Sequence, residues 1–420
     1  MGTGVFLNVS GGGHVIATYG MVAELVKRGE RIVYYEAPRY QSDIEALGAE
    51  FRAYPDIRPY EGPLAGWPFH HELDLPPILT WCALEWIPQI LEPIRELAPD
   101  YIVHDSLSLW GKIIARLLGV PAVCSIHTPG YTWPIALSSS RFWRDIPQMV
   151  RRSSASLRYF RGLERRLRAA YDLPRTTFIE TFTNPQPVNI CHTPREFQTH
   201  DHLLDERYHF VASVHTRPNA EQSSFPLNRL QDPMIYIGFG TICDPGPQFY
   251  RNCVAAFAGN GHQVVMTLSA STKKEDLGAV PENFLVWSLV EDGLAPQLDI
   301  LPRAKLFVMN GGLGGAREAA WHSVPMLAFG TTFETYLNAE RIAQEGAGLS
   351  LPPDASAAQI GDAANEVLSN PRYQENSARI GRSCRAAGGA SRSADLVMSH
   401  ARGETVGQPH ANPAEAVAST

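Results

Sequence analysis

The chain has 420 residues, 44% of them hydrophobic, which is more apolar material than one ordinary core holds and predicts two globular domains. The formal net charge of −7 argues against nucleic acid and anionic membranes as partners, and no apolar run reaches the roughly 18–20 residues of a bilayer span. The six cysteines show no metal-like spacing and the N-terminus shows no secretion signal, which predicts reduced thiols, no bound metal and a cytoplasmic location.

The N-terminal half alternates short apolar runs with amphipathic segments. Strands are predicted over 5–9, 31–35, 101–104 and 122–126, and helices over 16–27, 90–97 and 109–118. Strands that alternate with helices in this way indicate a parallel sheet covered on both faces.

A polar, proline-containing segment, 217–233, predicts a linker, and the pattern then restarts. After it, strands are predicted over 234–239, 263–268, 284–287 and 305–309, and a helix over 249–257. We therefore expect an α/β protein of two tandem Rossmann-like, doubly wound domains facing a cleft. The expected parts are an N-terminal domain 1–216, a linker 217–233, a C-terminal domain 234–402 and a disordered tail 403–420.

A glycine-rich turn follows the strand predicted over 305–309. It reads Asn310-Gly311-Gly312-Leu313-Gly314-Gly315 and leads into an Ala/Glu-rich helix. Such a turn aims free backbone N–H groups and a helix dipole at a phosphate. The alternative is that the glycines only let the helix pack closely on the sheet.

His14 follows three glycines at the mouth of the first predicted strand, and Asp105 directly follows the strand predicted over 101–104. Both lie at the same edge of the sheet, so the carboxylate could hold one ring nitrogen of His14 and leave the other to take a proton. The alternative is that His14 only caps or packs against the following helix. His104 should point to the opposite face of its strand and serve structure.

Aromatic residues cluster in the expected loops of the N-terminal half. They favour a large apolar ligand pocket, although we expect at least half of such residues to fill cores. The candidate pocket residues are Trp67, Trp81, Trp86, Tyr131 and Trp133.

Several of these motifs resemble those of the family 1 glycosyltransferases with the GT-B fold, above all the bacterial macrolide- and antibiotic-modifying enzymes. Gly13-His14 matches the segment with the family's catalytic base, and the run PDYIVHD, which ends at Asp105, matches the segment with its acidic partner. Ile237 to Thr241 is similar to the loop whose hydroxyl approaches the donor diphosphate.

The C-terminal half carries further family motifs. Pro296-Gln297 begins a segment that matches the family's Pro-Gln motif, and Glu318 falls where the family places the carboxylate that binds the ribose. Glu334 matches the acid of the sugar-binding pair. With the glycine-rich turn, the resemblance implies donor contacts from Thr241, Gln297, Asn310, Gly311, Gly312, Gly314, Gly315, Glu318, Glu334 and Thr335.

The resemblance implies an acceptor-binding N-terminal domain and a nucleotide-sugar-binding C-terminal domain. It implies an inverting, metal-independent enzyme with no cofactor. This enzyme would move a sugar from a UDP- or dTDP-linked donor to a hydroxyl of an apolar natural product, such as a polyketide or macrolide. His14, oriented by Asp105, would be the base. Self-association as a homodimer is left open.

Four donor positions depart from the family pattern: Leu294, Asn310, Gly315 and Thr335. They stand where the family has a base-stacking aromatic residue, a phosphate-binding His, a phosphate-binding Ser and a sugar-binding Gln. Backbone N–H groups of the glycine-rich turn could replace the lost phosphate donors, and Trp287 could stack on the base. The short Thr335 side chain would suit a deoxysugar.

Two alternative functions follow from these departures. The first is a GT-B-like enzyme with a degenerate donor site that performs His-dependent acid–base chemistry on a small molecule. The second is a non-catalytic auxiliary partner of a glycosyltransferase.

Overall fold

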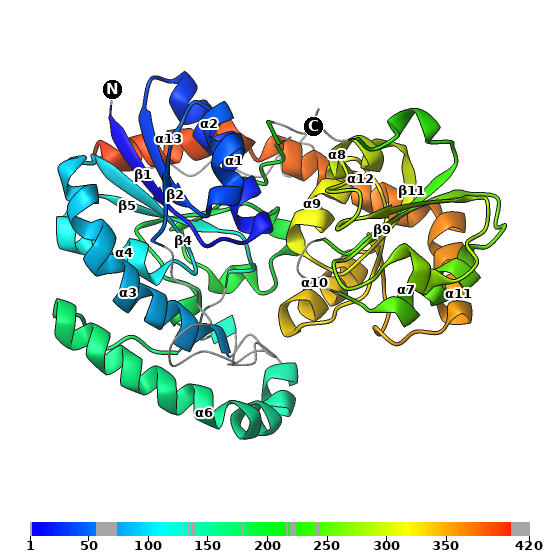
Figure 1. Ribbon diagram of the computed structural model, residues 1–420, viewed down its shortest axis with the longest axis horizontal. Helices are drawn as coiled ribbons and strands as arrows, with labels where there is room; N and C mark the ends of the chain where they lie inside the picture. The colour runs from blue at the N-terminus through cyan, green and yellow to red at the C-terminus, as the bar shows by residue number, and fades with distance from the viewer. Residues whose placement is uncertain are drawn as a thin grey trace, which may run out of the picture.

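The computed structural model describes residues 2–55, 74–130, 132, 134–135, 140–178, 180–215, 217–218, 224–240 and 244–404. Side chains are described for all of these except 140–153, 155 and 333. The two halves of the chain lie side by side, each built on its own sheet (Figure 1).

The N-terminal half contains a seven-stranded sheet, in the part of the chain described, whose paired strands all run parallel. The spatial order is β3-β2-β1-β4-β5-β6-β7. The strands are β1 (Thr3–Leu7), β2 (Arg31–Glu36), β3 (Glu50–Ala53), β4 (Tyr101–Asp105), β5 (Ala122–Ile126), β6 (Val188–Cys191) and β7 (Tyr208–Phe210). The helices are α1 (Gly12–Lys27), α2 (Gln41–Ala46), α3 (Leu75–Glu96), α4 (Leu109–Leu118) and α6 (Ser140–Tyr171).

The C-terminal half contains a six-stranded parallel sheet, again among the described residues, in the order β10-β9-β8-β11-β12-β13. Its strands are β8 (Met234–Gly238), β9 (Gln263–Leu268), β10 (Phe284–Ser288), β11 (Ala304–Met309), β12 (Met326–Ala328) and β13 (Gly348–Ser350). Its helices are α7 (Pro247–Phe257), α8 (Gln297–Ile300), α9 (Leu313–Trp321), α10 (Phe333–Gln344), α11 (Ala357–Ser369) and α12 (Pro371–Ala386). The predicted fold class is confirmed: both halves are doubly wound α/β units.

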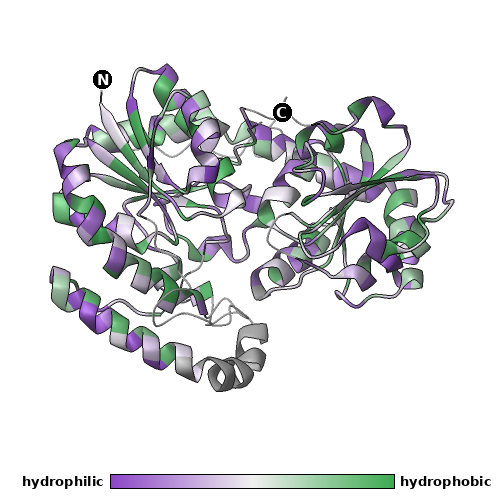
Figure 2. Cartoon of the chain, viewed as in Figure 1, coloured by the Kyte–Doolittle hydropathy of each residue, from purple (hydrophilic) through white to green (hydrophobic). Residues whose placement is uncertain are grey.

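Both sheets are buried on two faces. Val5 and Leu7 of β1 pack in the cluster formed with α3 and α4, whereas Phe6, which points the other way, packs with α1 and α2. Figure 2 shows the result, with largely hydrophobic strands at the centre of each half and hydrophilic residues concentrated outside them. Because both faces of each sheet are buried, the strands have near-continuous apolar sequences.

In each half, the strand order reverses between two central strands, which are β1 and β4 in one and β8 and β11 in the other. The crevice outside the carboxyl ends of such a pair is where doubly wound folds bind ligands. Asp105 ends β4, and His14 lies in the first turn of α1, which follows β1. Asn310 follows β11, so both sets of predicted residues lie beside these crevices.

The boundaries of β1, α1 and α3 differ from the sequence expectations in ways that bear on the predicted site. β1 ends at Leu7 and α1 already begins at Gly12, so His14 lies in the first helical turn rather than in a loop. α3 runs through Pro88 and Pro93, where we expected only 90–97, because packing of its apolar face on α4 and α6 outweighs the prolines.

The predicted domain limits stay predictions, but two contacts bear on them. Phe225 and Leu230, from the expected linker, are buried in the core of the C-terminal half. The last helix, α13 (Gly389–Ala401), packs against α1 of the N-terminal half. From residue 405 onward, the predicted disordered tail lies outside the described residues.

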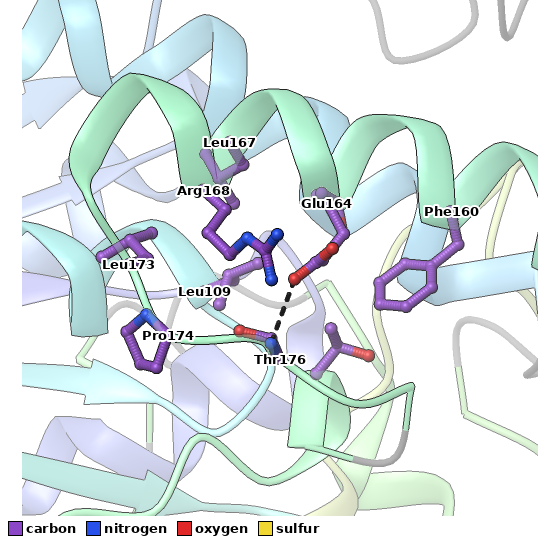
Figure 3. Close-up of a pocket in the computed structure, with 10 residues that line it drawn as sticks. Leu109, Phe160, Glu164, Leu167, Arg168, Leu173, Pro174 and Thr176 are labelled. Carbon is purple, nitrogen blue, oxygen red and sulfur yellow. Dashed lines mark hydrogen bonds between the residues drawn. The ribbon is translucent and has the colours of Figure 1, made fainter.

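α6 packs along α3 and, with α4 and residues 173–181, encloses a small pocket (Figure 3). There the Glu164 carboxylate accepts a hydrogen bond from the Thr176 N–H at 3.2 Å. None of the residues that line this pocket is a predicted site residue, so we interpret the contact as support for the chain that follows α6. Within the described part of the chain, no helix combines the length and the apolar character that crossing a membrane requires.

Candidate functional site

The predicted contact between His14 and Asp105 is present. The first turn of α1 carries His14, the last residue of β4 is Asp105, and the His14 Nδ1 lies 2.7 Å from the Asp105 Oδ2. Asp105 is fully buried, and its other oxygen accepts the Leu107 N–H at 2.7 Å. The side chain of His14 is 17% exposed. This arrangement ties Nδ1 to the carboxylate and leaves Nε2 as the nitrogen available to a ligand.

Carboxylates surround His14 from both halves of the chain. Burial alone would lower the pKa of His14, but attraction and hydrogen bonding to Asp105 outweigh it and raise the pKa above 6.5. The charges of Glu334, from α10, and Glu36, at the end of β2, raise the pKa of His14 further. The imidazole is therefore a stronger base than an exposed histidine.

His104 has the structural place expected of it. It is buried, its Nδ1 donates to the Asp105 main-chain oxygen at 2.9 Å, and its Nε2 lies 2.8 Å from the Gln186 amide nitrogen. Burial lowers the pKa of His104 to about 4, so this histidine stays neutral.

A third ring lies next to the His14–Asp105 pair. The His127 Nε2 is 3.5 Å from the Asp105 Oδ2, and the ligand atoms of all three residues lie within 4.8 Å of one another. This spacing would admit a divalent cation. A cation would have to displace the proton of the 2.7 Å hydrogen bond between His14 and Asp105, so we interpret the group as a hydrogen-bonded base.

The glycine-rich turn is shorter than expected, because α9 already begins at Leu313 with Gly312 as its N-cap residue. Gly314 and Gly315 are thus helical, not part of a flexible loop. Asn310 turns inward, and its Oδ1 accepts the Gly312 N–H at 3.1 Å. The open N–H groups at this point are those of the first helical turn, which have no intrahelical acceptor.

Gly315 has a packing reason. A Cβ at this position would lie 3.2 Å from the Met309 Cε and 3.3 Å from the Phe307 ring. That ring is stacked on Tyr236, with 4.9 Å between centroids, and cannot easily move. A serine at this position would therefore crowd the buried Met309 and Phe307 side chains.

We expect Gly315→Ser to lower the free energy of unfolding by about 1–3 kcal/mol through crowding, without tightening nucleotide binding. Thermal denaturation and calorimetric titration with UDP measure the two effects. Gly361→Ser, at a helical glycine whose Cβ would have 3.9 Å of clearance, is the matched control. A tenfold gain in nucleotide affinity would show instead that the position contacts the donor.

Glu318 and Gln297 form a pair at the predicted ribose position. The Gln297 Nε2 donates to the Glu318 Oε2 at 2.7 Å, and the Gln297 Oε1 accepts from the Tyr236 hydroxyl at 3.3 Å. Burial raises the pKa of Glu318, and Arg317 and Gln297 oppose the rise. The carboxylate is thus oriented by a neighbour before any ligand arrives.

Thr335 has a local partner that the sequence did not suggest. It is buried, and its hydroxyl accepts the N–H groups of Thr331 and Thr332 at 3.1 and 2.9 Å in a capping box for α10. A sugar hydroxyl would have to compete with these bonds, so the deoxysugar interpretation gains nothing from this residue. Glu334, the neighbouring acid, acts on His14 as described above.

The Trp287 side chain, a candidate to stack on the nucleotide base, contacts other parts of the protein. Its indole N–H donates to the Gly293 oxygen at 2.9 Å, and its ring packs edge-on against Phe225. Leu294, 41% exposed, occupies the family's aromatic position. The predicted diphosphate contact Thr241 lies outside the described residues.

Of the five predicted pocket aromatics, two are described: Trp81 is buried and Trp86 is partly buried. Trp81 is 7% exposed in the core between α3 and its neighbours, so the structure shows it in a packing role, and its assignment to a ligand pocket stays a prediction. Trp86 stacks on Tyr54 at 4.4 Å and meets Trp110 edge-on at 4.5 Å. Both belong to α3, whose apolar face is buried. The other three, Trp67, Tyr131 and Trp133, lie outside the described residues.

Comparison with known proteins adds an independent line of evidence. Residues 251–389 match the family model of the erythromycin biosynthesis protein CIII-like C-terminal domain. The chain is 28% identical over 411 residues to the uncharacterized UDP-glucosyltransferase YojK of Bacillus subtilis (strain 168), covering 96% of this chain and 98% of that protein. It is 27% identical over 414 residues to the oleandomycin glycosyltransferase of Streptomyces antibioticus, covering 95% and 92%. The crystal structure of the calicheamicin glycosyltransferase CalG4 superposes with a TM-score of 0.76 at 25% identity, covering 95% of this chain and 98% of that one.

The chain is a homologue of the GT-B antibiotic glycosyltransferases. The resemblance drawn from the motifs is thereby confirmed, and so is the assignment of this enzyme as a glycosyltransferase. The roles of individual residues in this glycosyltransferase remain predictions, since the comparisons do not test them.

Sequence reasoning missed the polar residues that adjoin the His14–Asp105 pair or continue from it into the glycosyltransferase. They are Glu36, Ser125, His127, His192 and Arg317. A usable signal was present for two of them, because His127 and His192 each directly follow a strand of the parallel sheet, at the same edge as Asp105.

Proposed function

We propose that this glycosyltransferase is an inverting, metal-independent enzyme that moves a sugar from a nucleoside diphosphate donor to a hydroxyl of an apolar natural product. The observation that carries the proposal is the buried Asp105 carboxylate, 2.7 Å from His14 at the edge between β1 and β4. The natural-product acceptor is suggested by the named activities of relatives such as the oleandomycin glycosyltransferase.

In the proposed reaction, the acceptor oxygen attacks the anomeric carbon as its proton passes to the His14 Nε2. The new C–O bond forms on the face opposite the donor's C–O bond, which breaks and leaves its electron pair on the diphosphate. Asp105 stabilises the imidazolium without taking the proton itself.

The leaving diphosphate needs donors that do not depend on the family's histidine. The N-terminus of α9 offers first-turn N–H groups and the positive end of its dipole, and Gly312 leaves their approach open. Each such donor to a developing anion is typically worth about 2.7–4 kcal/mol, so backbone groups can replace a lost side chain.

Donor competence is tested by titrating the protein with UDP and dTDP in a calorimeter in the presence of EDTA. We expect saturable binding of at least one nucleotide, and sugar transfer that persists in EDTA. Lack of binding at millimolar nucleotide would contradict the proposal and favour a degenerate donor site. Activity that disappears in EDTA and returns with a divalent cation would contradict metal independence.

The proposed base predicts the pH dependence of kcat/KM. His14 accepts a proton only when neutral, so kcat/KM should fall as the pH drops through the pKa of His14, with a midpoint above 6.5. Glu334→Gln removes one charge that raises this pKa and should lower the midpoint. Glu366→Gln, in α11, serves as the control. A midpoint that Glu334→Gln leaves unchanged would show that its charge does not reach the base.

A further inference from the structure

A chain of buried polar side chains continues from Asp105 into the protein. The His127 Nε2 lies 3.5 Å from the Asp105 Oδ2 and 2.9 Å from the Ser125 hydroxyl. The same hydroxyl lies 2.9 Å from the His192 Nε2, and the two imidazole rings stack with 4.6 Å between centroids. All of these side chains are buried. Ser125, His127 and His192 have no part in the proposed proton transfer itself.

Strand pairing fixes the order of these polar side chains. Asp105 and Ser125 are register partners on β4 and β5, and His127 follows β5 directly. His192 follows β6, and its N–H donates to the Ile126 oxygen at 3.0 Å. The parallel sheet therefore brings four polar residues from three neighbouring strand ends together.

The hydrogen-bonding capacity of Ser125 limits how the two histidines bond to it. Its hydroxyl has one proton and two acceptor lone pairs, so it donates to at most one of the two ring nitrogens and at least one histidine donates to it. The His127 Nε2 also faces the Asp105 carboxylate, where a lone pair would be repelled, so this nitrogen carries the proton. His127 therefore donates to the Ser125 hydroxyl.

We propose that His127, held by Ser125 and His192, is a positioning residue for the catalytic base: it covers the Asp105 carboxylate and fixes it against His14. This inference rests on the proposed function of His14. Without the imidazole, water would reach the carboxylate, and the attraction between Asp105 and His14 would weaken as the local dielectric rises. Burial and the neighbouring His192, His14 and Arg317 hold the pKa of His127 well below 6.5, so it does not compete with His14 for the proton.

This series of polar side chains also reaches the C-terminal half of the protein. Arg317 of α9, which is 5% exposed, donates to the His192 main-chain oxygen at 2.6 Å. Its neighbour Glu318 is the predicted ribose ligand. These buried contacts thus connect the base to α9, the helix that carries Glu318. They hold the Asp105 carboxylate at a fixed position relative to the donor site.

The test is an NMR titration of histidine side chains in the full-length protein, together with the kinetics of sugar transfer. The groups that face His14 are Asp105, Glu36, Glu334 and His127. We expect His127→Ala to move the His14 midpoint down toward 6.5 and to lower kcat about 10- to 100-fold with little change in KM. His127→Gln keeps an amide donor and should restore most of both values.

Two further variants complete the design. Ser125→Ala removes only the hydroxyl link and should shift the His14 midpoint in the same direction by a smaller amount, so the inference remains testable if His127→Ala does not fold. His209→Ala, at another buried histidine whose pKa burial lowers to about 4, should leave His14 unchanged.

The NMR midpoint does not depend on turnover, so it separates the two proposals. An unchanged His14 midpoint and unchanged kcat in both His127→Ala and Ser125→Ala would overturn the positioning role. A shifted midpoint in a protein that transfers no sugar would instead leave the positioning intact and contradict the proposed function.

Discussion

Replacement of His14 by alanine is expected to lower kcat/KM about 10²- to 10⁴-fold, the usual contribution of a positioned general base. The acceptor hydroxyl would then lose the only imidazole nitrogen that the described part of the site leaves open toward a ligand. Binding of the nucleotide should be unaffected, because the predicted donor contacts all come from the C-terminal half of the chain. Initial rates of transfer and calorimetric titration with UDP or dTDP measure the two quantities.

Asp105→Asn provides a second arm of this experiment. The amide keeps the size of the side chain but removes the charge that stabilises the imidazolium, so both the rate and the acidic midpoint of kcat/KM should fall. His202→Ala, at an exposed histidine outside the site, is the control. If the His14→Ala enzyme retained more than a tenth of wild-type activity, His14 would not be the base.

Replacement of Gly311 by alanine is expected to abolish measurable nucleotide binding. Gly311 has a φ of +76°, and a Cβ there would lie 2.4 Å from the Thr335 main-chain oxygen. The backbone conformation alone costs about 1–3 kcal/mol for a residue with a Cβ. The clash must in addition push the start of α9 away from α10, which moves the first-turn N–H groups from the predicted diphosphate position.

Gly259→Ala separates strain from displacement. Gly259 has a φ of +59° and open space around its Cβ position, in the turn between α7 and β9. It should lose stability but keep nucleotide affinity, as thermal denaturation and calorimetry would show. If Gly311→Ala bound nucleotide as tightly as Gly259→Ala, the glycine-rich turn would have no donor role.

Prediction from the sequence was most successful where a motif ends a strand. His14 and Asp105 were paired on the reasoning that both lie at the carboxyl edge of one parallel sheet, and the structure has their side chains 2.7 Å apart. The carboxyl ends of parallel strands lie at one edge of a sheet, which is why the sequence predicts that both residues lie there, whereas their contact depends on β1 and β4 being neighbours.

The sequence is least informative where a side chain has more than one possible partner. Trp81 lies in the core, because α3 continues through two prolines and turns its apolar face inward. Thr335 caps its own helix, and the Trp287 indole binds Gly293, two contacts that the sequence does not suggest. Which partner each side chain contacts depends on the backbone groups that the fold brings near it.

The sequence by itself therefore determined the two doubly wound halves, the candidate base with its carboxylate, and the family to which the motifs belong. Apolar periodicity and motifs at strand ends are local properties of the sequence, and they can be recognised without knowledge of the packing. Only the tertiary structure decided which polar groups continue from the Asp105 carboxylate into the protein. His127, Ser125, His192 and Arg317 meet near Asp105 because neighbouring strands and the two halves of the chain converge there, and the free energy of burying these groups depends on that convergence.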